Sequence, residues 1–213
     1  MRKILSTVFA IVGLALAGKA QDYGFQRGNV LLEGSFQAGS VKHRNEDVEQ
    51  VSVGFNPKIG YFISDNFALG ADLSIGYTRQ TIGTASQFAP LESKSNNLSL
   101  GAFGRYYFLD IGSRFKTYAE VGAGYLQNKS RSTYLGQSPS EVTQKGFEAN
   151  AGIGANFFLT DRIAVNFSLA DLLSYQRLKP DWPNAEPISA FSTNANVFNN
   201  FFDSYRFGLT FKF

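Results

Sequence analysis

The 213-residue sequence contains no cysteine and only one histidine, His43. Without cysteine the chain can form neither a disulfide framework nor a thiolate metal site. A single histidine leaves little for a zinc site or for histidine-based catalysis. We therefore expect no catalytic residues, no bound metal and no cofactor. Long apolar runs are scarce as well, and a mean hydropathy of −0.14 excludes a bundle of transmembrane helices.

The one apolar run lies at the N-terminus. Two basic residues, Arg2 and Lys3, precede the run at 4–16, which is too short to span a membrane. Small residues at Gly18 and Ala20 then favour cleavage after Ala20. This arrangement predicts a secretory signal peptide over residues 1–20, followed by an N-terminal lead over residues 21–28.

The basic pI of 9.0 depends on that signal. Its removal takes Arg2, Lys3 and Lys19 from the 20 basic residues and leaves 17 basic against 17 acidic residues. No basic patch with interleaved aromatic residues remains in the processed chain, so we expect no nucleic-acid partner.

The processed chain alternates between apolar and polar residues with a period of two, which is the pattern of β-strands. In one run, for example, Leu69, Ala71 and Leu73 alternate with Gly70 and Asp72. The pattern predicts eight strands within a domain over residues 29–213, with runs at 32–39, 51–63, 67–78, 97–108, 116–125, 147–159, 163–169 and 204–213.

The connections between these runs alternate between short and long. The tight ones are 64–66, 110–114 and 160–162, and the long polar ones are about 41–50, 79–96, 127–145 and 177–202. Short turns at one rim and long loops at the other are typical of an outer-membrane barrel. The predicted fold class is therefore all-β, a transmembrane eight-stranded antiparallel up-and-down β-barrel.

Alternation alone does not decide which face points outward. A lipocalin-like soluble barrel, acting as a secreted lipid carrier, would bury the apolar face around its ligand. Here the polar face is rich in glycine, serine, asparagine and threonine and carries only one or two charges per strand, which suits the narrow interior of an eight-stranded barrel. Aromatic residues gather near the short-turn rim, as in an interfacial girdle, at Tyr61, Phe67, Phe108, Phe115, Phe157, Phe211 and Phe213. We therefore expect the apolar face to contact lipid.

With its secretory signal, eight alternating runs and aromatic C-terminus, the chain resembles small outer-membrane β-barrel proteins of the OmpA/OmpX-like group. The resemblance implies residence in the outer membrane of a Gram-negative-type cell and contact with outer-membrane lipid. It also implies recognition by the barrel assembly machinery through the last strand, at Tyr205, Phe207, Phe211 and Phe213. Nothing follows Phe213 that could form a periplasmic peptidoglycan-binding domain, so cell-wall tethering is not implied.

Charged residues on the polar face fall at similar depths from the short-turn rim. Around the predicted sheet their signs alternate, in the order Arg206, Glu33, Lys58, Asp72, Arg105 and Glu120. A charge in a narrow interior needs an opposite partner, since its desolvation is otherwise costly. The order predicts a lumen charge belt that closes the interior, with Arg105 separating Asp72 from Glu120. The alternative is an ion or proton path.

Two features bear on function. Trp182, the only tryptophan, and Phe191 lie in the fourth predicted loop and are possible contacts for an extracellular ligand or surface partner; the alternative is packing over the barrel mouth. His43 has acidic neighbours but no serine at a recognisable spacing, so an exposed loop histidine is favoured over a catalytic one.

We expect a monomeric, non-enzymatic barrel that serves surface interaction or envelope integrity. The alternatives are a porin-like small-solute pore and a lipid-modifying enzyme.

Overall fold

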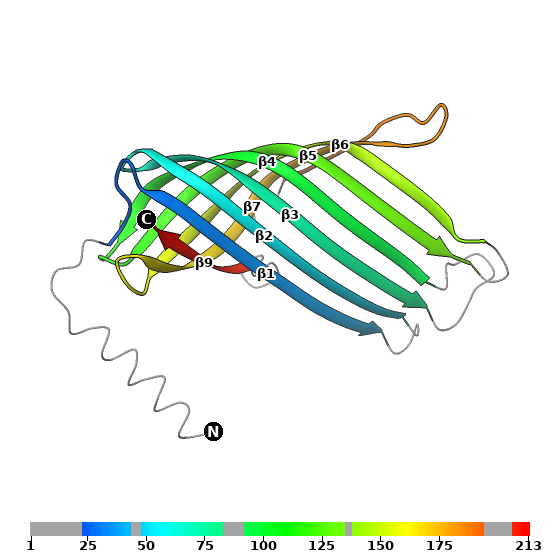
Figure 1. Ribbon diagram of the computed structural model, residues 1–213, viewed down its shortest axis with the longest axis horizontal. Coiled ribbons are helices and arrows are strands. Elements are labelled where there is room, and N and C mark those ends of the chain that lie inside the picture. The colour runs from blue at the N-terminus through cyan, green and yellow to red at the C-terminus, as the bar shows by residue number, and fades with distance from the viewer. Residues whose placement is uncertain (1–22, 44–47, 83–91, 135–137, 194–205) are drawn as a thin grey trace, which may run out of the picture.

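The computed structural model describes residues 23–43, 48–82, 92–134, 138–193 and 206–213 (Figure 1). These residues form nine strands: β1 (Val30–His43), β2 (Val48–Ser64), β3 (Phe67–Ile82), β4 (Glu92–Ile111), β5 (Phe115–Thr133), β6 (Ser140–Phe158), β7 (Ile163–Pro180), β8 (Ile188–Thr193) and β9 (Arg206–Lys212). The first seven are 14 to 20 residues long, more than the roughly 9–11 residues that cross a bilayer. No helix in the described ranges is long and apolar enough to span a membrane.

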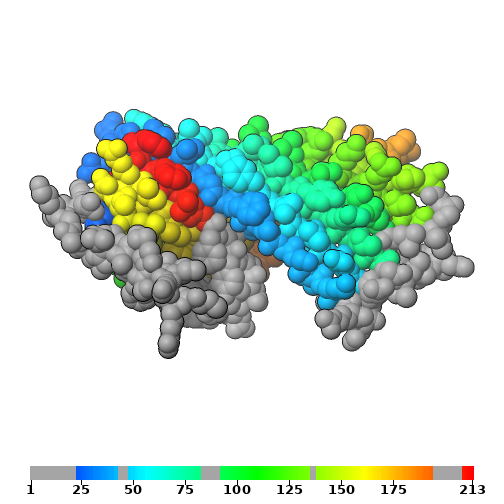
Figure 2. Space-filling model, turned by 60° about the horizontal axis from the view of Figure 1, so that its bottom comes forward, coloured from blue at the N-terminus to red at the C-terminus, as the bar shows by residue number. Residues whose placement is uncertain are grey.

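All strand pairings are antiparallel, and they return to their starting point. Strands β1 to β7 pair consecutively, and β9 pairs with both β1 and β7. These eight strands therefore form a closed ring. In the space-filling view β9, coloured red, lies between β7 in yellow and the beginning of β1 in blue (Figure 2).

Strand β8 has no counterpart in the eight-strand prediction. It pairs with residues 173–178 of β7, whereas β9 pairs with residues 163–168 on the same edge of that strand. The segment predicted as a fourth long loop thus begins as a hairpin between β7 and β8. Strand signals were weak there because apolar and polar residues do not alternate regularly around Pro180, Pro183 and Pro187.

The other long loops are also shorter than predicted, because the strands continue into their ranges. The clearest case is the third loop, predicted at 127–145, where β5 runs to Thr133 and β6 begins at Ser140. Here both faces are polar, and Ser95 and Ser130 each donate a hydrogen bond to Asn128 Oδ1 at 3.0 Å. Without an apolar face the period-two signal ends, although backbone pairing continues.

The three tight connections lie where they were predicted. Strands β2 and β3 are separated by residues 65–66, β4 and β5 by 112–114, and β6 and β7 by 159–162. Gly112 has a φ of +65° in its turn, a conformation that side chains other than glycine's rarely adopt. The predicted signal peptide, residues 1–20, lies outside the described residues.

Most of the large apolar side chains point out of the ring. Leu32, Phe55, Ile59 and Leu100 are between 43% and 62% exposed. Five of the seven predicted aromatic girdle residues, Tyr61, Phe108, Phe157, Phe211 and Phe213, are exposed as well, whereas Phe67 and Phe115 are half-buried. The interior instead holds charged, amide and hydroxyl side chains together with a small aromatic cluster. This is the outward apolar face expected from the sequence and the reverse of a lipocalin-like arrangement.

Candidate functional site

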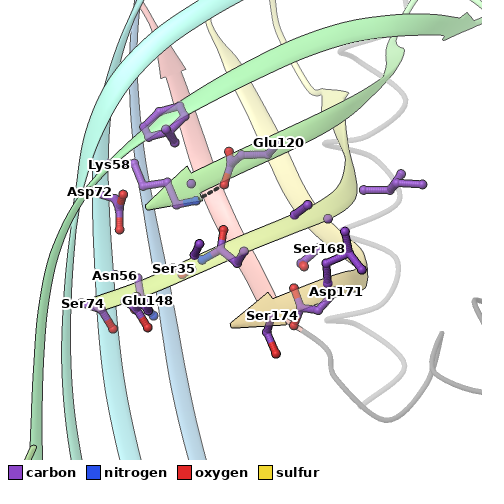
Figure 3. A pocket seen from close by; sticks show the side chains of 18 of the residues that line it. Ser35, Asn56, Lys58, Asp72, Ser74, Glu120, Glu148, Ser168, Asp171 and Ser174 are labelled. Atoms are coloured by element: carbon purple, nitrogen blue, oxygen red, sulfur yellow. Dashed lines mark hydrogen bonds and ion pairs between the residues drawn. The ribbon is translucent and has the colours of Figure 1, made fainter. Parts of the chain in front are cut away.

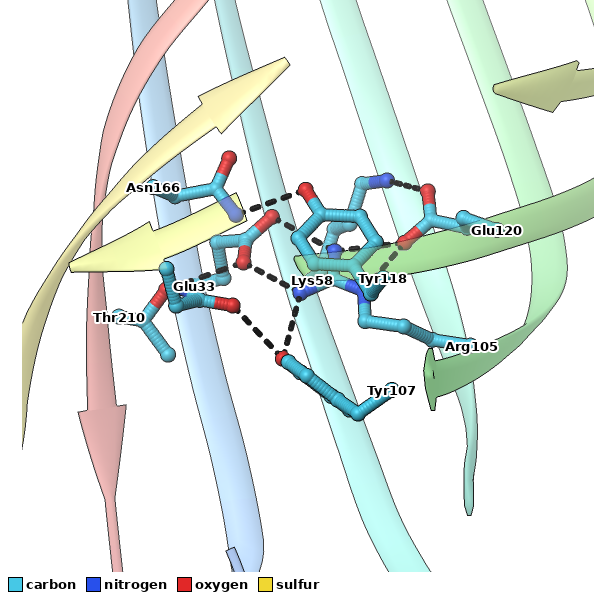
Figure 4. Close-up of polar contacts among 9 residues, drawn as sticks. Glu33, Lys58, Arg105, Tyr107, Tyr118, Glu120, Asn166 and Thr210 are labelled. Carbon is cyan, nitrogen blue, oxygen red and sulfur yellow. Dashed lines mark hydrogen bonds and ion pairs between the residues drawn. The ribbon is translucent and has the colours of Figure 1, made fainter. Parts of the chain in front are cut away.

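Arg105, on β4, is the centre of an ion cluster inside the ring (Figure 4). Its side chain has no exposed surface, and its guanidinium binds both oxygens of Glu33, at 2.8 and 3.1 Å. On the other side its Nε and Nη2 atoms contact Glu120 Oε2 at 2.7 and 2.5 Å. Lys58 of β2 forms a further ion pair with Glu120. Two cations and two carboxylates from β1, β2, β4 and β5 therefore neutralise one another.

The guanidinium also lies against aromatic rings. Its Cζ is 3.9 Å from the ring centre of Tyr118 and 5.6 Å from that of Phe103. A desolvated cation over an aromatic face is attracted by the ring quadrupole. Arg105 is therefore held from two sides by carboxylates and from a third by an aromatic face, and we attribute its complete burial to this arrangement.

A circuit of hydrogen bonds links Arg105 back to Glu33 through three neutral side chains. Arg105 Nη1 is 3.5 Å from the hydroxyl of Tyr107, which donates to Asn156 Oδ1 at 2.7 Å. Asn156 donates to Thr210 at 2.9 Å, and Thr210 donates to Glu33 at 3.0 Å. The circuit joins β1, β4, β6 and β9. A parallel bond from Asn166 to the Tyr118 hydroxyl, at 2.8 Å, ties β7 to β5.

An aromatic layer lies inside the ring on its short-turn side. Phe25, in the N-terminal lead, stacks on Phe62 with ring centres 4.3 Å apart and planes 12° from parallel. Its ring also lies 5.0 Å from that of Tyr107 and 5.3 Å from that of Phe158. Lys212 donates a hydrogen bond to the carbonyl of Gly24 at 2.8 Å and so holds the lead to β9.

Glycines make room for these rings. A Cβ atom built on Gly154 would overlap the ring of Tyr118. Gly70 would likewise meet Phe103, at 2.6 Å from Cζ. The small residues that the sequence places on the inner face thus accommodate large side chains from neighbouring strands.

Beyond the ion cluster, away from the short turns, the interior contains a cavity of about 450 Å³ (Figure 3). Its lining is mostly polar, with acidic groups from Asp72, Glu148 and Asp171 in addition to Glu120 and Glu33. Lys58 is the only basic residue among the described lining residues. Glu148 accepts a hydrogen bond from Ser99. The arrangement would favour cations over anions.

The predicted charge belt is only partly assembled by these contacts. Glu33, Lys58, Arg105 and Glu120 are brought together, but Arg105 contacts Glu33 where Asp72 was predicted. The reason is register: Asp72 pairs with Gly101, while Arg105 pairs with Ala68, so Asp72 lies four residues away along β4. The side chain of Arg206 lies outside the described residues.

The other predicted sites are dispersed. Trp182 and Phe191 are 51% and 69% exposed, the first in the turn after β7 and the second on β8, paired with Tyr175. Phe211 and Phe213 point out of the ring at its short-turn end. Tyr205 and the side chains of Phe207 and His43 lie outside the described residues. Among the described residues, no group of three or more acidic or histidine side chains could hold a metal ion.

Sequence reasoning missed the neutral members of the site, namely Tyr107, Tyr118, Asn156 and Thr210. The sequence contains a signal for one of them, Tyr107, and for the neighbouring aromatic layer. Three aromatic pairs, Tyr61-Phe62, Tyr106-Tyr107 and Phe157-Phe158, interrupt the alternation at the same rim. Since adjacent strand residues point to opposite faces, one member of each pair had to enter the interior.

Comparisons with known proteins agree with this fold. A family model described as outer membrane protein beta-barrel domain matches residues 7–213. Among solved structures, the outer membrane protein OprG from Pseudomonas aeruginosa is 12% identical, with a TM-score of 0.51, 89% of this chain and 98% of that chain covered.

Two further structures are similar at lower scores. Ail, the attachment invasion locus protein of Yersinia pestis, is 16% identical, with a TM-score of 0.44 and coverage of 88% and 100%. The N-terminal beta-barrel domain of Pseudomonas aeruginosa OprF is 19% identical, with a TM-score of 0.40 and coverage of 88% and 98%. No curated protein matches the chain.

Proposed function

The chain belongs to the outer membrane protein beta-barrel domain family and is an outer-membrane protein, and we propose that it is a non-enzymatic transmembrane barrel with a closed interior. Its ring of eight paired strands would cross the outer membrane, with the short turns toward the periplasm and the longer connections outside the cell. The C-terminal strand, with Phe211 and Phe213 on its outer face, would serve as the signal for barrel assembly.

The exposed apolar face supports insertion in lipid. Residues such as Phe36, Ile59 and Val121 are between 54% and 65% exposed. In water this surface would far exceed the few hundred square ångströms of contiguous apolar patch that soluble proteins usually expose. Acyl chains are therefore the environment that fits the outside of the ring.

The main support for a closed interior is the position of Arg105. Its fully buried guanidinium bridges Glu33 and Glu120 across the ring, and the aromatic layer around Phe25 lies beneath it. Two obstructions in series favour a structural barrel over an open pore. The outer hairpin with Trp182 and Phe191 would then be displayed for contact with a surface partner or would contribute to envelope integrity.

The purified, processed chain tests this proposal in two steps. First, it should fold only with detergent or lipid and should migrate differently in electrophoresis before and after boiling. A chain that is folded and monodisperse in plain buffer would contradict the transmembrane barrel. Second, the folded protein in planar bilayers should show no steady conductance. Steady open conductance would contradict the closed interior and leave the barrel intact.

A cation-preferring pore is the second candidate, and the acidic cavity favours it. Carboxylates of Asp72, Glu148 and Asp171 line a volume of about 450 Å³ on the outer side of the ion cluster. Such a vestibule would concentrate cations if the cluster opened. A preference for potassium over chloride in steady bilayer currents would support this candidate over the closed barrel.

A further inference from the structure

The outward face of the ring changes character toward the outer ends of the strands. Along most of each strand this face is apolar, and at the outer ends seven basic residues follow in the same outward positions of β3 to β7. We call them the basic girdle: Arg79, Lys94, Lys129, Arg131, Lys145, Arg177 and Lys179. Each lies in the same alternation phase as exposed apolar residues of its strand, such as Ile75, Leu98 and Leu173. The outward face of these strands is therefore apolar along most of its length and basic at its outer end.

Aromatic residues mark the boundary between the two zones. Tyr175 precedes Arg177 by two residues, and Phe147 follows Lys145 by two, so each pair shares one face of its strand. The rings of Tyr125 and Phe147 contact each other edge to face across β5 and β6, with centres 6.0 Å apart. Tyrosine and tryptophan gather where acyl chains meet headgroups, which places the girdle at headgroup level.

Strand register places like charges opposite one another within the girdle. Arg79 pairs with Lys94, Lys94 pairs with Arg131, and Lys145 pairs with Lys179. Like charges directly across an antiparallel pair destabilise a sheet. Three such pairs on one face need anionic groups nearby to balance their charge.

Acidic side chains balance only one side of the girdle. Glu92 bridges Arg79 and Lys94, at 2.5 and 2.8 Å, and Glu141 lies 3.3 Å from Lys129 and 3.7 Å from Arg131. On β6 and β7 the exposed side chains of Lys145, Arg177 and Lys179 form no ion pair with any other described residue. The uncompensated charge is therefore concentrated at the outer ends of β6 and β7.

We propose that the β6–β7 part of the basic girdle, Lys145, Arg177 and Lys179, binds the phosphate groups of phosphorylated lipids in the outer leaflet. This inference rests on the proposed transmembrane barrel, because it is the barrel that places these side chains at the lipid surface. A lipid matches the site on two counts: its acyl chains cover the apolar face, and its phosphates reach the cations above. A free phosphate ion would satisfy only the second.

The test compares two variants that each lose two positive charges. R177Q/K179Q removes two of the three cations of the proposed site and keeps Lys145 on β6. R27Q/R162Q removes two exposed arginines at the short-turn rim and is the matched control. Each protein is folded in dodecyl maltoside micelles and titrated with diphosphoryl lipid A, with the fully dephosphorylated lipid, and with inorganic phosphate. Native mass spectrometry counts the bound lipids.

The wild-type protein should bind diphosphoryl lipid A at least tenfold more tightly than the dephosphorylated lipid and should retain no inorganic phosphate at equal concentration. At about 1 kcal/mol for each basic residue near a charged lipid surface, R177Q/K179Q should lose roughly 30-fold in affinity. The control should keep the wild-type affinity.

Equal affinity for the two lipids, or an equal loss in R27Q/R162Q, would overturn the lipid site. Binding of inorganic phosphate as tight as that of the lipid would overturn the assignment to lipid. These outcomes are distinct from failure of the barrel itself, because they are scored only on protein that shows the heat-dependent electrophoretic shift. Absence of that shift in every micelle and vesicle would contradict the proposed function instead.

Discussion

Arg105 and Glu33 face each other across the ring and form a two-bond ion pair, with both carboxylate oxygens accepting from separate guanidinium nitrogens at 2.8 and 3.1 Å. The two residues come from β4 and β1, which are not neighbours in the sheet. The pair therefore spans the interior, in contrast to the cross-strand pairs that stabilise ordinary sheets. Its planar, two-pronged geometry is one that arginine can provide and lysine cannot.

Replacement of Arg105 by leucine should destabilise the folded protein strongly. The variant leaves Glu33 and Glu120 in the interior without the cation that joins them, and loss of one partner from a buried ion pair costs about 3–5 kcal/mol. Arg105→Lys keeps the charge but loses the paired geometry, with an expected cost of about 1.5–3 kcal/mol. Urea unfolding in lipid vesicles measures both; equal stability of wild type and R105L would refute a structural role for the cluster.

The neutral side chains of the circuit should matter as well. Thr210→Val removes the hydroxyl that donates to Glu33 and accepts from Asn156. The buried Asn156 amide then loses its acceptor, and Glu33 Oε2 keeps only its hydrogen bond from Arg105, so we expect a loss of about 1–3 kcal/mol. The matched control is Thr81→Val at the exposed outer end of β3, where a change within about 0.5 kcal/mol is expected. A comparable loss in both variants would mean that a threonine-to-valine change in a strand accounts for the effect, and that the hydrogen bonds of Thr210 do not.

Much of the fold could be predicted from the sequence because one physical signal marks the ring of strands. From Leu32 to Phe211 most outward side chains are apolar and most inward ones are polar or small, so alternation marks each strand. Where both faces are polar, as around Ser95 and Asn128, this alternation disappears and the predicted strands were too short.

The candidate site was harder to predict. Charge order correctly brought Glu33, Lys58, Arg105 and Glu120 to one region, since charged residues on an inner face must find partners. It paired Arg105 with Asp72, however, because sequence order describes neighbours around the ring and not contacts across it. Glu33 is reached through the interior, and such contacts depend on side-chain length and strand shear. Phe25 was missed because the N-terminal lead carries no alternation at all.

The fit between Gly154 and Tyr118 provides a test of interior packing. A Cβ atom at Gly154 would overlap the Tyr118 ring, and overpacking of this kind costs about 1–3 kcal/mol. Gly154→Ala should therefore lower the free energy of unfolding by that amount. Gly76→Ala is the matched control, because its Cβ atom would lie 3.6 Å from the nearest atoms, an ordinary contact. If the two substitutions had equal effects, the backbone cost of replacing a strand glycine would account for both.

The two obstructions of the interior should act in series. Arg105→Ala leaves the aromatic layer in place, and Phe25→Ala leaves the ion cluster, so neither single variant should conduct steadily in planar bilayers. The double variant R105A/F25A opens both layers, and we expect a steady current. Because Glu33 and Glu120 then line the path without Arg105 between them, that current should favour potassium over chloride. The heat-dependent electrophoretic shift confirms that each variant is folded before currents are compared. A single variant that conducts as well as the double one would show that one layer alone closes the interior.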